Sequence, residues 1–223
     1  MTRSGQRPDS SYLEVVSPHE SSLDRLRSIA GPSLGTGAKS FDGVPNELAA
    51  WLSVSNGFYV FESALHVYPS EPAAMGTMTA QMWNDPNLWR SGYGSMAEEM
   101  FFFAEDVFGG QFAMRNGEVL TLDPETGATE TLASSLAEWA ECVLDDFEFL
   151  TGYPLAHAWQ ERHGPLAVNE RLVPKQLFVL GGEYSVDNLY ALDAVEGMRL
   201  RADVAMQLAD LPDGTSVTLK IIE

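Results

Sequence analysis

The chain has 223 residues, of which 45% are hydrophobic and 20% are charged, so its composition excludes a disordered or fibrous protein. Its 13 Lys and Arg residues stand against 32 Asp and Glu residues, and the net charge of −19 argues against nucleic-acid and anionic-lipid partners. The single cysteine, Cys142, excludes an internal disulfide and a cysteine-based zinc site, and we interpret it as a small buried apolar residue.

The N-terminal segment, residues 1–20, is polar and is predicted to be flexible. It lacks the apolar core of a secretory signal. No later segment reaches the roughly 18 apolar residues that a membrane-spanning helix needs. We therefore expect a cytoplasmic protein without a membrane partner, and a lone cysteine fits that reducing compartment.

Short elements are predicted between residues 21 and 100. In chain order they are a helix over 21–29 with a Ser N-cap, a loop over 31–43, a helix over 45–52, strands over 58–61 and 65–68, and a short helix over 79–83. The segment 69–100 is irregular and rich in Met and Trp. It is expected to form a satellite apolar cluster of Trp83, Trp89, Met75, Met78 and Met82.

The middle of the chain predicts a hairpin and two helices. Asn116-Gly117 lies between apolar strands over 111–115 and 118–122, which indicates a type I′ turn. Ser135 and Glu138 have the spacing of a capping box, and apolar residues continue at helical spacing to Leu150. The remaining elements expected here are strands over 101–104 and 128–132 and a helix over 154–163.

The C-terminal segment is predicted to add strands over 177–180, 189–192 and 216–222 and a helix over 196–208. Strands and helices are segregated along the chain, which favours an α+β fold with a largely antiparallel sheet flanked by helices. We expect one α+β domain over residues 21–165. Residues 166–223 are predicted to be a C-terminal α/β extension packed on that domain.

A search for catalytic or metal-binding patterns finds none that is specific. The histidines, His19, His66, His157 and His163, do not have metal-ligand spacing, and no Gly-x-Ser-x-Gly nucleophile elbow is present. His66 is expected to point to solvent. No catalytic residue, metal or cofactor is therefore predicted. The chain is interpreted as a binding protein rather than an enzyme, and only titratable residues converging in a pocket would favour a hydrolase.

Adjacent carboxylates recur along the chain. Glu98-Glu99, Glu105-Asp106 and Asp145-Asp146 point in different directions on a helix or strand, which suits acid–base chemistry poorly. They indicate a solvated acidic face. This face either only keeps the protein soluble or binds a basic partner.

Four segments in order resemble the SUKH superfamily, which includes bacterial immunity proteins and a yeast cell-wall regulator. They are the helix and Asn56-Gly57 turn within 48–58, the acidic-Gly-Gln-Phe pattern within 103–112, the turn over 123–127, and the helix start over 134–139. The resemblance covers residues 44–160 and departs at Gly110, where Asn is more usual.

The resemblance implies a protein that binds and occludes a cognate bacterial toxin, and the negative charge favours a basic, nucleic-acid-targeting one. The alternative is a regulatory or scaffold protein of the same superfamily that binds endogenous partners. Oligomeric state is left open. The residues expected to contact the partner are the aromatic anchors Trp89 and Tyr93 and the carboxylates Glu98, Glu99, Glu105 and Asp106.

Overall fold

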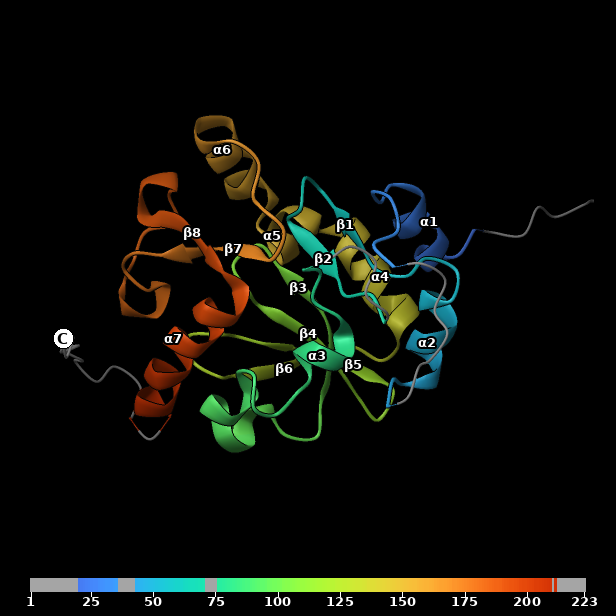
Figure 1. The fold of residues 1–223 in the computed structure, drawn as a ribbon, viewed down its shortest axis with the longest axis horizontal. Helices are drawn as coiled ribbons and strands as arrows, with labels where there is room; N and C mark the ends of the chain where they lie inside the picture. Colours follow the sequence, from blue (N-terminus) through green and yellow to red (C-terminus); the bar gives the residue numbers. More distant parts are fainter. Residues whose placement is uncertain (1–19, 36–42, 71–75, 210, 212–223) are drawn as a thin grey trace, which may run out of the picture.

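A computed structural model describes residues 20–35, 43–70, 76–209 and 211, and it shows an α+β fold (Figure 1). The main sheet is antiparallel and its strand order follows the chain. Its strands are β1 (Phe58–Val60), β2 (Leu65–Val67), β3 (Phe101–Asp106), β4 (Gln111–Arg115), β5 (Glu118–Leu122) and β6 (Thr129–Ala133). The antiparallel sheet flanked by helices is thus confirmed.

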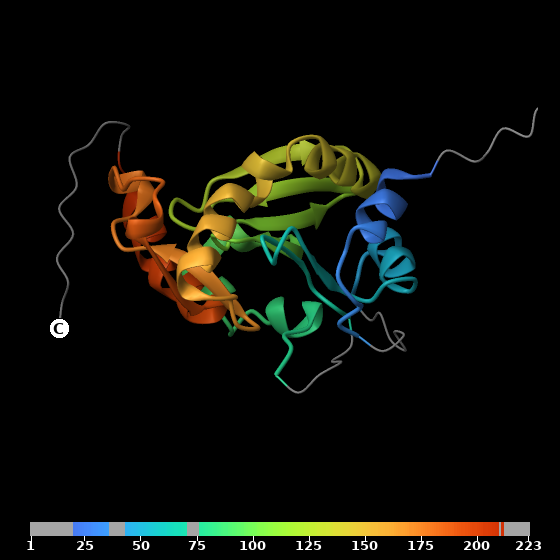
Figure 2. The same ribbon diagram turned by 90° about the horizontal axis from the view of Figure 1, so that it is seen from above.

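Helices surround this sheet, and Figure 2 shows α4 on one side of it and α3 on the other. They are α1 (Ser22–Ser28), α2 (Asn46–Leu52), α3 (Ala80–Trp83), the 3₁₀ segment η1 (Arg90–Ala97), α4 (Leu136–Asp145), α5 (Phe147–Thr151) and α6 (Tyr153–His163). A C-terminal unit follows. It consists of β7 (Glu170–Pro174), the 3₁₀ turns η2 (Phe178–Leu180) and η3 (Val186–Asn188), β8 (Leu189–Asp193) and α7 (Ala194–Leu208).

The predicted hairpin and the predicted cap both form. Asn116 and Gly117 have φ values of 55° and 90°, as a type I′ turn requires, and they join β4 to β5. Ser135 caps α4 by accepting from the Glu138 amide, while the Glu138 carboxylate reaches back to Ser134. The helix predicted to continue to Leu150 is broken, because Asp146 leaves helical geometry (φ −137°, ψ 51°) between α4 and α5.

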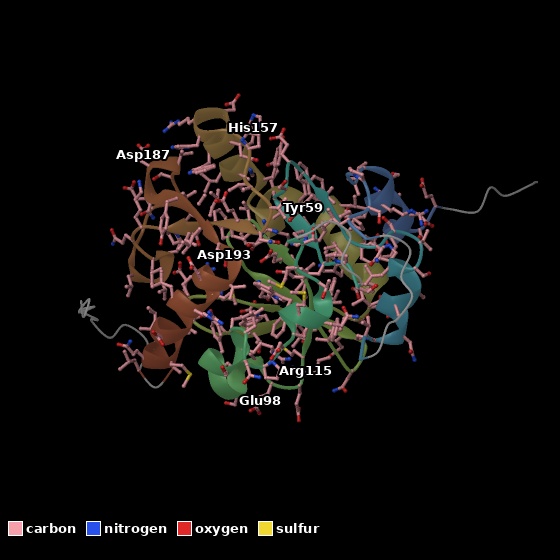
Figure 3. All side chains as sticks on the ribbon, in the orientation of Figure 1. Tyr59, Glu98, Arg115, His157, Asp187 and Asp193 are labelled. Carbon is pink, nitrogen blue, oxygen red and sulfur yellow. The ribbon has the colours of Figure 1, made fainter. Side chains whose placement is uncertain are left out.

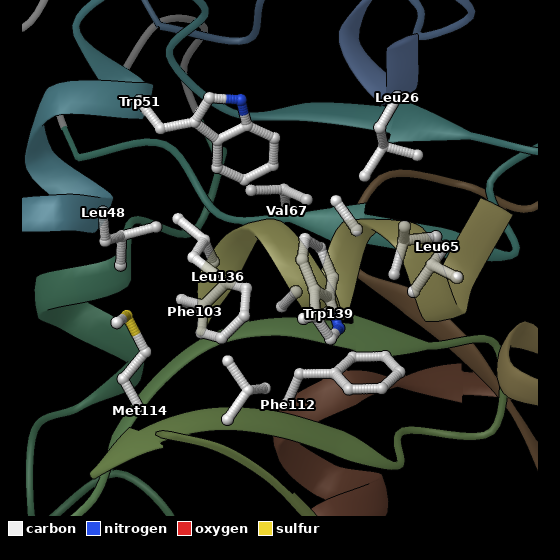
Figure 4. Packing of buried hydrophobic residues seen from close by; sticks show 14 of the residues in the cluster. Leu26, Leu48, Trp51, Leu65, Val67, Phe103, Phe112, Met114, Leu136 and Trp139 are labelled. Carbon is white, nitrogen blue, oxygen red and sulfur yellow. The ribbon is translucent and has the colours of Figure 1, made fainter. Parts of the chain in front are cut away.

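One face of the sheet packs against α1, α2 and α4 (Figure 4). Trp139 of α4 lies at its centre and is fully buried. Its ring makes edge contacts with Trp51, Phe103 and Phe112 at centroid distances of 5.9, 4.9 and 5.6 Å. Strand alternation explains this set, since Phe112 and Met114 face this core while Ala113 between them faces the other one.

The opposite face packs against α3, η1 and the C-terminal helix α7. Its buried residues include Trp83, Trp89, Tyr93, Phe102, Leu120, Met198 and Ala202. The tryptophans that the sequence assigned to a satellite cluster therefore belong to a second main core. Met82 is 51% exposed and does not join it, and Met75 lies outside the described residues.

One prediction for the C-terminal segment is wrong, one strand was missed, and another prediction lies outside the described residues. Residues 177–180 form the 3₁₀ turn η2 rather than a strand, because Gly181 adopts φ 81° and the Gly182 amide bonds back to the Leu177 carbonyl. The strand β7 was not predicted, and it pairs with β8 in a separate ribbon. The strand predicted over 216–222 lies outside the described residues.

No helix within the described ranges combines the length and apolar character that crossing a bilayer requires.

Candidate partner-binding groove

A groove of about 940 Å³ opens at the end of the sheet next to the C-terminal unit. It is lined by the ends of β3, β4 and β5, the turn after β5, α7, α5, the start of α6, η2 and Tyr184, and we call the part around Asp106 and Glu125 its floor. The principal lining residues are Asp106, Phe108, Gln111, Asp123, Glu125, Glu130, Glu148, Phe149, Phe178, Val179, Tyr184 and Arg201.

The groove is strongly acidic. Five carboxylates line it against one guanidinium, that of Arg201; the carboxylates are Asp106, Asp123, Glu125, Glu130 and Glu148. Within the described residues, none of these five carboxylates has a cationic side chain within 4 Å. We call this feature the acidic groove. A basic side chain entering it would be attracted by the excess of carboxylates over the single Arg201 guanidinium among the described residues.

Exposed aromatic rings form part of the same groove. Phe149 is 81% exposed and Tyr184 is 68% exposed, although both are large enough to contribute to a core. Tyr184 stacks on Phe178 with centroids 3.9 Å apart, and Phe108 meets both rings edge-on. Exposed rings held by packing are the kind of contact surface that protein partners bury.

Gly152 allows α6 to approach the groove floor. Its φ of 69° is left-handed, and a Cβ on it would lie 2.4 Å from the Phe108 ring. A side chain at this position would therefore displace a ring that supports the aromatic wall.

Asp106 is held in the floor by the turn that follows β3. Its Oδ1 accepts hydrogen bonds from the Phe108 and Gly110 amides, both at 2.8 Å. Burial raises the pKa of Asp106 to about 7, against the lowering effect of these two hydrogen bonds and of Arg201. The carboxyl group thus titrates near neutral pH.

Glu125 is the most buried of the five carboxylates, at 4% exposure. Its Oε2 accepts from the Val179 amide at 2.8 Å, which ties the turn after β5 to η2. Its Oε1 has no hydrogen-bond partner among the described residues. Burial raises the pKa of Glu125, while the Val179 and Phe178 amides lower it.

Replacing Asp106 with Asn is expected to stabilise the protein at about pH 8 by on the order of 2–4 kcal/mol. Between about pH 4 and pH 7 the folded state holds a proton on Asp106 that the unfolded state releases, so wild-type stability falls as pH rises through this window. The advantage of the variant should vanish as pH falls towards 4. Urea unfolding of both proteins across this pH range measures the difference in their unfolding free energy. The exposed Asp145→Asn is the control. A difference between Asp106→Asn and wild type that is the same at every pH would contradict the raised pKa of Asp106.

A second polar cluster is buried between β2 and β3 of the main sheet and β7 of the C-terminal unit. Glu105 is buried and pairs with the equally buried Arg171 of β7 at 2.7 Å and with His66 Nδ1 at 3.1 Å. Burial acts to raise the pKa of Glu105, but Arg171 and the His66 hydrogen bond outweigh it and the pKa is lowered. Burial lowers the pKa of His66 to about 4, so its neutral ring donates to the Glu105 carboxylate.

The predicted contact residues are therefore only partly brought together. Glu105 is 1% exposed, and the expectation that it contacts a partner is wrong, as is the expectation that His66 points to solvent. Trp89 and Tyr93 are also buried, at 1% and 0% exposure, so neither can be a surface anchor. Trp89 packs edge-on against Phe102, and the Tyr93 hydroxyl donates to the Pro124 carbonyl at 2.7 Å.

Asp106 is the one predicted contact residue that lines the acidic groove. Glu98 and Glu99 are exposed but do not line it; Figure 3 labels Glu98 at the lower edge of the view. Three further residues of the groove were not predicted from the sequence, namely Glu125, Phe149 and Tyr184. A signal existed for Phe149, because it falls off the apolar stripe that Phe147 and Leu150 continue.

Across residues 20–35, 43–70, 76–209 and 211, no three His, Cys, Asp or Glu side chains are arranged to hold a metal ion.

Comparisons with known proteins define the class of fold. No protein-family model and no curated protein matches the chain. Among solved structures, it is similar to the crystal structure of Atu4351 from Agrobacterium tumefaciens, with a TM-score of 0.53 and 12% identity over 80% of this chain and 87% of that one. At this identity the similarity concerns the fold alone, that of an α+β protein.

Proposed function

We propose that this protein is a non-enzymatic immunity protein that binds a basic bacterial toxin through the acidic groove and occludes the toxin's active site. The observation that carries the proposal is the groove itself, where five carboxylates and one guanidinium lie beside the exposed rings of Phe149 and Tyr184. The resemblance of residues 44–160 to the SUKH superfamily supports the same conclusion.

Charge and aromatic rings have separate parts in this proposal. The net charge of −19 speeds encounter with a basic protein and rejects acidic ones. Phe149 and Tyr184 supply the apolar area that slows dissociation once the partner is seated. Toxins that cleave or modify nucleic acid hold phosphates on basic surfaces, so a partner that covers such a surface blocks the substrate.

The test is a capture and protection experiment with the full chain. The tagged protein is used to isolate partners from its native host and from competing strains, and a captured toxin is then expressed with and without it. We expect one basic protein at equal ratio and restored growth. The groove variant Glu148→Lys/Phe149→Ser changes two exposed residues and should weaken binding about 100-fold or more.

The matched control reverses charge outside the groove. Glu98→Lys alters one exposed carboxylate, changes the net charge by the same two units as Glu148→Lys, and should retain protection. Equal loss in both variants would show that net charge alone matters and would remove the groove from the proposal. Capture of endogenous regulatory or cell-wall proteins alone would instead favour the scaffold alternative.

One observation favours a second candidate, a hydrolase. Two carboxyl groups with raised pKa values, Asp106 and Glu125, line the same groove, as a general acid and base would. Each already has one oxygen bound by backbone amides, which favours a fixed binding role. Turnover of neutral chromogenic glycosides that Asp106→Asn abolishes would establish the hydrolase and displace the immunity proposal.

A further inference from the structure

We propose that the floor of the acidic groove is a subsite for one arginine side chain of the partner, whose guanidinium pairs with Glu125 and Asp106 and stacks on the Tyr184 ring. This inference rests on the proposed function, because it names the group that the groove receives.

Among the residues that the structure describes, no cationic side chain forms an ion pair with the floor. Arg201 is the nearby candidate, and it is 1% exposed. Its guanidinium donates to the Gly197 and Phe108 carbonyls and approaches the Met198 sulfur at 3.8 Å. The N–H groups of Arg201 thus donate to these carbonyls and approach this sulfur, and they do not pair with Asp106 or Glu125. Arg201 therefore reduces the negative potential of the groove without forming an ion pair.

Glu125 supplies a hydrogen-bond acceptor that the described part of the chain does not use. One carboxylate oxygen is fixed by the Val179 amide, and the other, Oε1, is buried without a partner. Leaving a buried charged oxygen unpaired costs free energy, and a donor carried by a ligand would recover it. A cationic donor fits best, since Asp106 and three further carboxylates line the same groove.

Tyr184 makes the site selective for a planar cation. Its ring is 68% exposed and is held parallel to Phe178, with an interplanar angle of 5°. Tyr184 lines the same groove as Glu125, Asp123 and Asp106, and burial together with these carboxylates raises the pKa of its hydroxyl. A guanidinium can stack on this ring and bond a carboxylate in its own plane, whereas an ammonium cannot do both.

The experiment uses the full chain and three small probes. N-acetyl-arginine amide, N-acetyl-lysine amide and the uncharged N-acetyl-citrulline amide are titrated by NMR and calorimetry. For a ligand of this size we expect a Kd of about 1 mM or weaker for arginine. Lysine and citrulline amides should bind at least about 10-fold more weakly.

Variants locate the site. Glu125→Gln should weaken arginine amide at least about 10-fold, and the exposed Tyr184→Leu should weaken it several-fold without affecting folding. Glu98→Gln, outside the groove, should leave binding unchanged. Arginine affinity should also rise between about pH 5 and pH 7, because the bound cation favours ionised Asp106.

The two proposals fail separately. Equal binding of arginine and lysine amides, binding that Glu125→Gln and Tyr184→Leu leave unchanged, or no saturation by arginine amide up to about 50 mM would overturn the subsite, even if a toxin is captured. Arginine-selective binding that both variants weaken would uphold the subsite, even if the captured partner proves not to be a toxin.

Discussion

The Glu105→Gln variant is expected to lose about 3–5 kcal/mol of unfolding free energy at neutral pH. The substitution leaves the Arg171 guanidinium buried without its counter-charge, and Arg171 is 1% exposed, so water cannot replace the carboxylate. The same change weakens the hydrogen bond that holds His66. Urea unfolding followed by tryptophan fluorescence and circular dichroism measures the loss.

Two further proteins make this result interpretable. The double variant Glu105→Leu/Arg171→Met removes both charges and should be clearly more stable than Glu105→Gln, because no unpaired charge remains. The exposed Glu118→Gln should be within about 0.5 kcal/mol of wild type. Because the pKa of Glu105 is lowered in the fold, its contribution is present above the unfolded pKa and is lost as pH falls through the folded pKa. A wild-type-like Glu105→Gln would show that the pair contributes no net stability.

Trp139→Ala is expected to destabilise the protein by about 3–5 kcal/mol. The indole is fully buried at the centre of the core between the sheet and α1, α2 and α4, and it contacts Trp51, Phe103 and Phe112. Its removal leaves a cavity that three rings on different elements cannot close together. Chemical denaturation gives the free-energy difference, and the unchanged slope with denaturant confirms that the folded state is retained.

Phe149→Ala is the matched control for this substitution. It also deletes a large ring, but one that is 81% exposed, so the change in stability should stay within about 0.5 kcal/mol. A large loss at Phe149 would show that the ring supports the fold and is not free for a partner. A small loss at Trp139 would mean that this core collapses readily around the missing ring.

Local patterns were sufficient to predict most of the main sheet. The Asn116-Gly117 turn fixes the β4–β5 register, and the capping of Ser135 fixes the start of α4, because both depend on residues within a few positions of one another. Two local predictions failed, those of one long helix to Leu150 and of a strand over 177–180, and each failed because of the backbone conformation of one residue. Asp146 breaks the long helix, and Gly181 turns 177–180 into a 3₁₀ segment.

The burial of a charged side chain could not be predicted where its charge is paired by a residue far away in the sequence. Glu105 has the sequence context of a solvated carboxylate, and its partner Arg171 lies on a strand of the C-terminal ribbon that was not foreseen. The burial of His66 was missed for the same reason, because His66 is bonded to Glu105. Trp89 and Tyr93 lie in an irregular segment with no period, and only the packing of α7 on the second sheet face shows that they are core residues.

The acidic groove was only partly visible in the sequence. The Glu105-Asp106 pair was singled out, and the alternation of side chains along β3 separates the two, with Glu105 in the interior and Asp106 in the groove. Glu125 and Tyr184 come from turns far apart in the chain. Their meeting depends on the tie between Glu125 and the Val179 amide, which no spacing rule anticipates.

The order of the sheet has a consequence during synthesis on the ribosome. Strands β1 to β6 pair with their chain neighbours, so the whole sheet can form as soon as Ala133 has emerged. The face that α7 covers then remains open to solvent until residues 194–205 follow. At about 5–20 residues per second this interval lasts several seconds. Nascent chains should therefore present to chaperones the η1 surface that α7 covers, Tyr93 included, and chains terminated before α7 should aggregate.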